Sequence, residues 1–181
     1  MISLLKNRKV RNWCFFDFGI SSFPTLILTF FYGAFYARYI VGNSSEGASL
    51  WGFSVSLASL LAALIFLSIL FISLSSIKKI DVKFFKVFFF ILIISSSSLL
   101  FFNSESNKYH PLVLVIISFI AFEVVNLFYN ITLDKVTSKR SKGLISNFGW
   151  AFGYLGGFLA LIIVLLMLKI VEGDNELTTL I

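Results

Sequence analysis

Five apolar stretches, each long enough to cross a bilayer as a helix, constrain this chain more than any other feature of its sequence. A hydrocarbon core about 30 Å thick takes about 20 apolar residues to cross. The stretches cover residues 12–41, 50–75, 84–102, 112–130 and 145–171. Backbone groups in lipid must be satisfied internally, and these stretches do not alternate as barrel strands do. The sequence therefore predicts an all-α fold, a polytopic transmembrane bundle of five spans.

The composition agrees with a membrane protein and excludes several other classes. Hydrophobic residues make up 58% of the chain and charged residues 13%, with a mean hydropathy of +0.94. Soluble domains are about 45–50% apolar and about 25% charged, so a water-soluble globule and a disordered chain are both excluded. With one cysteine and one histidine, we expect neither a disulfide framework nor a metal site. No nucleophile–base pair and no phosphate-binding loop is visible, so we expect no enzyme and no cofactor.

The basic residues alternate between the two sides of the predicted membrane. Twelve of the 15 fall on one side, in three groups: Lys6, Arg8, Lys9 and Arg11; Lys78, Lys79, Lys83 and Lys86; Lys135, Lys139, Arg140 and Lys142. Basic loops stay cytoplasmic during insertion, so the N-terminus is expected inside. This predicts a basic cytoplasmic segment at 1–11, a transmembrane domain at 12–171 and an acidic extracytoplasmic tail at 172–181. The expected location is the plasma (inner) membrane, the main partner is the lipid bilayer, and the net charge of +6 requires no nucleic-acid partner.

Polar side chains line one face of the first and fourth spans. Asp17, Ser21 and Thr25 follow at i, i+4 and i+8, while Glu123, Asn126 and Asn130 follow at i, i+3 and i+7. Ionisable groups inside a membrane usually face protein or water. One interpretation is a cavity for a small polar solute, with a carboxylate that binds a proton or a cation. The alternative is hydrogen bonding between helices, at about 0.6 kcal/mol for each bond.

The fifth span combines a glycine face with a polar and aromatic face. Gly149, Gly153 and Gly157 form a doubled G-x-x-x-G pattern, and Gly156 lies beside them. This spacing lets another helix approach closely, so we expect helix packing there, with a moving contact as the alternative. Asn147, Trp150 and Tyr154 share a second face, which would either line a solute path or pack against a neighbour.

Three segments resemble a known transporter family. Trp13-Cys-Phe-Phe-Asp17-Phe-Gly-Ile-Ser21-Ser-Phe23 is similar to W-x-x-Y-D-W-A-N-S-x-F. Leu50-Trp51-Gly52-Phe53 is similar to L-W-G-Y. The segment Phe128-Tyr129-Asn130, followed by Ser146-Asn147-Phe148-Gly149-Trp150-Ala151-Phe152-Gly153-Tyr154-Leu155-Gly156-Gly157, is similar to F-Y-N followed by S-G-x-G-W-A-x-G-Y-L-G-G. These motifs belong to the vacuolar effluxer-like branch of the major facilitator superfamily, the autophagy-related amino-acid effluxers.

The resemblance implies a secondary transporter that moves a small polar solute by alternating access, with amino acids as the solutes of the fungal members. It further implies that helices one and four line the central cavity. The residues that fall on the motif positions are Asp17, Ser21, Asn130, Trp150, Gly153 and Tyr154. Glu123 lies on none of the quoted motifs, and its candidacy depends on its position inside a span.

Two departures from the family pattern lead to alternative hypotheses. Members have about twelve helices in two halves, so five spans suggest the N-terminal portion of a transporter, with a separately encoded C-terminal half as a partner. The family's G-x-x-x-D-R-x-G-R-[RK] loop is replaced over residues 73–83, which favours a degenerate, non-transporting membrane protein instead. A carrier built from several inverted copies ranks lowest, because such proteins need balanced loop charges.

Overall fold

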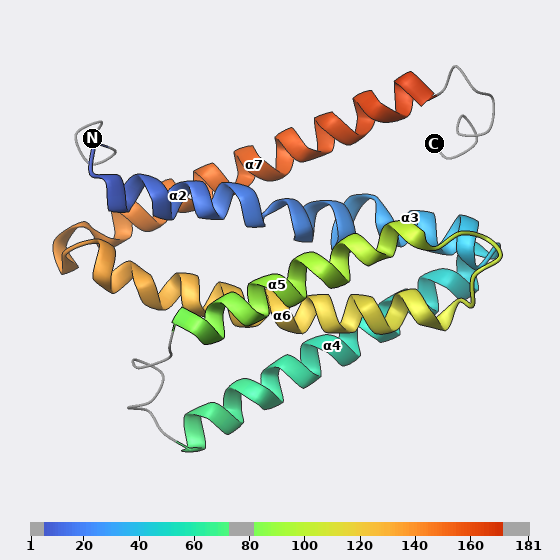
Figure 1. Ribbon diagram of the computed structural model, residues 1–181, viewed down its shortest axis with the longest axis horizontal. Coiled ribbons are helices and arrows are strands. Elements are labelled where there is room, and N and C mark those ends of the chain that lie inside the picture. The colour runs from blue at the N-terminus through green and yellow to red at the C-terminus, as the bar shows by residue number, and fades with distance from the viewer. Residues whose placement is uncertain (1–5, 73–81, 172–181) are drawn as a thin grey trace. The chain divides into compact units, whose positions relative to one another are not determined.

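The computed structural model describes residues 6–72 and 82–171, with side chains over 6–68 and 82–170. All regular structure in these ranges is helical (Figure 1). Five helical stretches are long and apolar enough to cross a membrane: Arg8–Ile40, Ser44–Ser68, Val82–Phe101, Tyr109–Val136 and Lys139–Ile170. The predicted all-α, multi-pass membrane fold is therefore confirmed, and the protein is an integral membrane protein.

Asparagine caps explain where the first two spans begin. Helix α2 (Arg8–Ile20) starts after Asn7, whose side chain accepts a hydrogen bond from the backbone amide of Lys9 at 2.9 Å. Helix α4 (Ser44–Ile72) starts after Asn43, which accepts from the amide of Glu46 at 3.1 Å. Such caps satisfy amides that have no partner in the first helical turn. Both helices consequently begin several residues before the apolar stretches predicted from residues 12 and 50.

The first span is an interrupted helix. Pro24 opens a π-helical segment, η1 (Pro24–Phe30), which is followed by the short helix α3 (Tyr32–Phe35) and a second π-helical segment, η2 (Tyr36–Ile40). Proline lacks a backbone N–H and breaks the regular i to i−4 ladder, which accounts for the change of register. Gly42, with a φ of +72°, then ends the span in a backbone conformation that glycine adopts readily.

The remaining elements complete the other spans. They are α5 (Val82–Ser98), the 3₁₀ turn η4 (Leu99–Phe101), α6 (Tyr109–Val136), the 3₁₀ turn η5 (Lys139–Ser141) and α7 (Lys142–Val171). Several basic residues expected in loops lie inside the helices, Lys83 and Lys86 in α5 and Lys135 in α6. The helices extend beyond the apolar stretches because backbone hydrogen bonding continues into the polar flanks.

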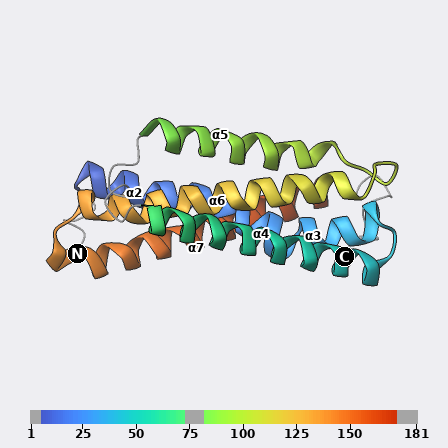
Figure 2. The same cartoon turned by 90° about the horizontal axis from the view of Figure 1, so that it is seen from below.

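The chain divides into two compact units. Unit 1 comprises residues 1–35 and 132–181, and unit 2 comprises residues 36–131. In unit 1, α2 and η1 pack against α7 (Figures 1 and 2). In unit 2, η2 packs against α4. The unit boundaries fall within two spans, after Phe35 in the first and after Ile131 in the fourth.

Apolar side chains of every size occur at buried positions, and many more large apolar side chains are exposed. Cys14 and Trp13 of α2 are buried, and so are Ala58 and Ala62 of α4. Exposed apolar side chains follow the length of α7, among them Phe158, Leu166 and Ile170. A soluble monomer rarely carries so much exposed apolar surface, and lipid tails are its natural solvent.

Some of the expectations lie outside the described residues. These are the acidic tail with Glu172, Asp174 and Glu176, the basic pair Lys78 and Lys79, and most of the loop at 73–83 where the family motif is replaced.

Candidate functional site

The polar stripe of the first span lies against the fifth span, within unit 1. Ser21 Oγ donates to Asp17 Oδ1 at 3.4 Å, and Thr25 Oγ1 donates to the Ser21 carbonyl oxygen at 2.8 Å. Opposite them is Gly153 of α7, where a Cβ atom would lie 2.8 Å from Ser21 Oγ and 3.1 Å from Asp17 Oδ2. The carboxylate of Asp17 therefore faces the backbone of another helix at close range.

The neighbouring glycines of α7 extend this close contact along α2 and η1. Gly149, Gly153, Gly156 and Gly157 are all buried. A Cβ on Gly156 would collide with the backbone carbonyl of Phe18, and one on Gly157 would collide with Thr25 Oγ1. A ring pair next to the glycines, Phe15 and Phe152, has its centroids 5.3 Å apart. The glycine face thus packs against the polar stripe, and absent side chains permit the approach.

The second face of α7 is exposed. Asn147, Trp150 and Tyr154 are all exposed, Trp150 by 64% and Tyr154 by 72%. The two rings form an edge-on pair with centroids 6.4 Å apart. The structure thus does not bring these three candidates together with Asp17 and Ser21 inside unit 1. Tyr154 lies twelve residues into α7, about 18 Å along the helix, where a hydroxyl group has few partners in lipid.

The fourth span carries its polar candidates on one face in its second half. Glu123 and Asn126 are half-buried, and Asn130 is exposed. Asn130 Nδ2 donates to the Asn126 carbonyl oxygen at 3.0 Å and lies 3.4 Å from Asn126 Oδ1. Glu123 lies at the middle of the 28-residue helix α6, about 20 Å from either end. It belongs to unit 2, whereas Asp17 belongs to unit 1.

A polar cluster that the sequence analysis did not single out joins three segments of unit 2. Lys108 Nζ donates to Glu46 Oε1 and forms an ion pair with it. The hydroxyl of Tyr36, a residue with no exposed surface, donates to the Lys108 carbonyl oxygen at 3.0 Å. The hydrogen bond with Glu46 raises the pKa of the Lys108 ammonium group above its ordinary value. The cluster ties η2, the start of α4 and the segment before α6 together.

Close packing supports this cluster. The rings of Tyr36 and Trp51 lie 5.8 Å apart between centroids. Gly47 is pressed against Ala37, where a Cβ would collide with the backbone of Ala37. Alternation of the loops predicts that residues 42–49 and 103–111 share one side of the membrane. This alternation is the sequence feature that could have indicated an ion pair between Glu46 and Lys108, which are 62 residues apart in the chain.

The described side chains contain no group of three or more His, Cys, Asp or Glu residues that could hold a metal ion. The candidate functional groups are the carboxylates of Asp17 and Glu123 and the hydroxyl and amide groups next to them. They can exchange a proton, attract a cation or hydrogen-bond a polar solute.

Comparison of the chain with family models, with curated proteins and with solved structures finds no match. The class that the fold defines is therefore a helical, multi-pass integral membrane protein.

Proposed function

We propose that this chain is part of a secondary transporter of the major facilitator type, which moves a small polar solute, an amino acid being the class we favour, by alternating access. One observation carries the proposal: the carboxyl group of Glu123 lies at the centre of a 28-residue apolar span, on the same face as Asn126 and Asn130. An ionisable side chain at this depth costs about 2.5–3.5 kcal/mol on insertion scales. An apolar residue would fill a purely structural position without that cost, which favours a functional role for Glu123.

The candidate residues take three different roles. Glu123 is the coupling group, which takes up and releases a proton as the solute moves. Asn126 and Asn130 offer amide groups that hydrogen-bond a polar solute. Asp17 and Ser21 lie against Gly153, where an added Cβ atom would come within 3.1 Å of both side chains. This contact leaves no room for a solute, so we assign the two residues to ion coupling or to helix contact.

The proposed transporter requires further helices. Trp150 and Tyr154 are exposed on α7, and they offer surface to such helices or to the solute path. A separately encoded C-terminal half is the partner that the resemblance to the major facilitator superfamily suggests.

The test is solute flux in proteoliposomes that contain the full chain together with the products of neighbouring reading frames. Uptake of a mixture of labelled amino acids is measured with and without a proton gradient. Glu123→Gln removes the coupling group and is expected to lower gradient-driven uptake at least tenfold. Glu105→Gln is the matched control, since it makes the same change at an exposed position between α5 and α6. Flux that is absent with every partner would contradict transport by this chain.

A second candidate function is a non-transporting membrane protein of degenerate transporter origin. A specific observation favours it: Asp17, Ser21 and Thr25 contact glycines of α7 and hydrogen-bond within their own helix, as residues of a structural seam do. Under this hypothesis Asp17→Asn and Glu123→Gln both leave the cellular phenotype unchanged. Loss of the phenotype with either variant, at unchanged protein level, would argue for transport.

A further inference from the structure

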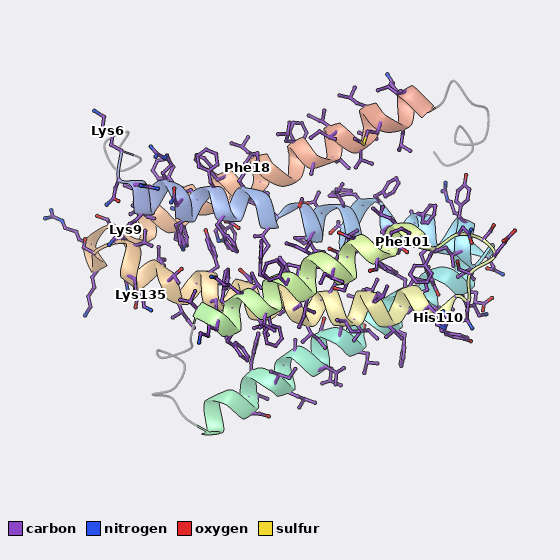
Figure 3. All side chains as sticks on the ribbon, in the orientation of Figure 1. Lys6, Lys9, Phe18, Phe101, His110 and Lys135 are labelled. Carbon is purple, nitrogen blue, oxygen red and sulfur yellow. The ribbon has the colours of Figure 1, made fainter. Side chains whose placement is uncertain are left out.

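Two basic segments that are far apart in the sequence lie at the same end of unit 1. Residues 6–11 contain four basic side chains and residues 135–142 contain four more, and all eight except Lys142 are exposed. Figure 3 shows Lys6, Lys9 and Lys135 together at this end. We call the eight residues the basic end: Lys6, Arg8, Lys9, Arg11, Lys135, Lys139, Arg140 and Lys142.

The direction of the helices explains why the two segments meet. Phe15 lies beside Phe152, Gly153 lies beside Asp17, and Gly157 lies beside Thr25. Residue numbers therefore rise together in α2 and α7, which means that the two helices run parallel. Their first turns, with Arg8 and Arg11 in one and Lys142 in the other, consequently fall at one end of the pair.

The charges at this end lack the usual compensation. The N-terminus of a helix carries a partial positive charge, and acidic residues normally occupy its first turn. Neither α2 nor α7 has an acidic residue in its first turn. Across residues 6–11 and 132–145 the only acidic side chain is Asp134, which pairs with Lys142. Eight cations and two helix ends of the same sign are thus gathered against one carboxylate.

We propose that the basic end binds the phosphate headgroups of anionic phospholipids. Orientation of the spans requires basic residues on one side of the membrane, but it does not require them to converge on one helix pair. The patch lies where apolar helices emerge from the bilayer, next to buried Trp13 and the apolar surface of α7. A lipid fits this position better than a soluble anion, because its acyl chains would lie along the spans while its phosphate met the cations. Basic clusters at the ends of spans attract anionic lipids in this way.

The test measures lipid binding to the purified full chain in detergent, by mass spectrometry of retained lipid or by thermal shift on titration. The probes are phosphatidylglycerol, phosphatidylcholine and, as a soluble anion, inorganic phosphate. At about 0.1 M salt we expect phosphatidylglycerol to bind at least tenfold more tightly than phosphatidylcholine. Raising the salt to about 1 M is expected to remove most of the difference, since the cations are exposed. This arm needs no variant, so it holds whether or not a variant folds.

Variants locate the binding. Lys139→Gln with Arg140→Gln, and separately Arg8→Gln with Lys9→Gln, are expected to weaken phosphatidylglycerol binding by about fivefold for each cation removed. Lys83→Gln with Lys86→Gln is the matched control, which removes two exposed cations from unit 2 and is expected to change binding less than twofold.

Three results would overturn the proposal. Equal binding of the two lipids would show that charge does not select. An equal loss in the control would show that the basic end is not the site, and a loss in only one of the two test pairs would show that the two segments do not act together. Inorganic phosphate that displaced the lipid at millimolar concentration would identify the site as one for soluble anions.

Discussion

A Cβ atom on Gly153 would lie 3.1 Å from the Oδ2 atom of Asp17, so the absence of a side chain at Gly153 is what lets α7 lie against the acidic residue of α2. Two features that are separate in the sequence, the carboxylate of the first span and the glycine pattern of the fifth, thus form one contact. We therefore expect substitutions of Asp17 to change how α7 packs against α2. Both roles proposed for Asp17, ion coupling and helix packing, depend on this one contact.

The glycine seam is expected to tolerate substitution unequally. Gly156→Ala places a methyl group against the backbone carbonyl of Phe18, which cannot rotate away, so the helices must separate. We expect a loss of about 1–3 kcal/mol in stability, as for other overpacked sites. Thermal unfolding in detergent measures it.

The control for this substitution is Gly52→Ala on α4. Beyond the adjoining backbone of α4, no atom lies within 4 Å of the new methyl group, and alanine is the better helix former by about 0.5–1 kcal/mol. We expect Gly52→Ala to be neutral or stabilising. Equal melting temperatures for the two variants would contradict the close approach of α2 and α7.

The hydroxyl of Tyr36 is expected to matter for stability. Tyr36→Phe removes the donor to the Lys108 carbonyl oxygen and keeps the buried ring. The bond is part-buried, and a hydrogen bond of this kind contributes about 0.5–1.5 kcal/mol, so we expect a loss in that range. Tyr109→Phe, at an exposed ring, is the control. An unchanged melting temperature for Tyr36→Phe would argue against the cluster in unit 2.

The ion pair between Lys108 and Glu46 is expected to depend on salt and on pH. Lys108→Glu should lower the melting temperature, and adding Glu46→Lys should restore it by re-forming the pair in reverse. The folded-state pKa of Lys108 is raised, chiefly by its hydrogen bond with Glu46. A lysine whose pKa is raised on folding stabilises the folded state. The stabilisation is fully present below the unfolded-state pKa, about 10.4, and is lost as the pH rises through the folded-state pKa.

The measurement compares the wild-type chain with Lys108→Gln between pH 7 and 11. The difference in melting temperature should stay constant up to about pH 10 and shrink above it. High salt should reduce the difference at every pH, because both side chains reach solvent. A difference that shrank between pH 7 and 9 would point to another titrating group.

The five spans could be predicted from the sequence because the bilayer imposes a length and a polarity on every crossing segment. The predicted stretch at 84–102 and the observed one at Val82–Phe101 differ by two residues at most. The start of α4 was predicted at Leu50 but lies at Ser44, since hydropathy does not register a cap such as Asn43. The π-helical segments after Pro24 were also missed, because a proline indicates a break without specifying the register that follows.

The candidate site was less accessible from the sequence. Helical spacing correctly placed Glu123, Asn126 and Asn130 on one continuous helix, because that requires only local geometry. The sequence did not show which helix the polar stripe of Asp17 would face, because this depends on tertiary packing. A G-x-x-x-G pattern indicates close packing but does not identify the helix that packs against it. The cluster of Tyr36, Glu46 and Lys108 was not singled out, since none of these residues stands out within its own segment.

The orientation of the spans can be tested around α6, the only described span between Ser106 and Ser138. One crossing separates the two positions, so single cysteines placed there must react from opposite sides of the membrane. Cys14 is fully buried, and Cys14→Ser supplies a background without it. In intact cells we expect Ser106→Cys to react with a membrane-impermeant maleimide and Ser138→Cys to stay protected until the cells are opened, because the basic residues around Ser138 favour the cytoplasm. Labelling after denaturation controls for reactivity. The reversed pattern would contradict the expected orientation, and labelling of both from one side would contradict a crossing by α6, on which the depth of Glu123 and the transporter proposal both depend.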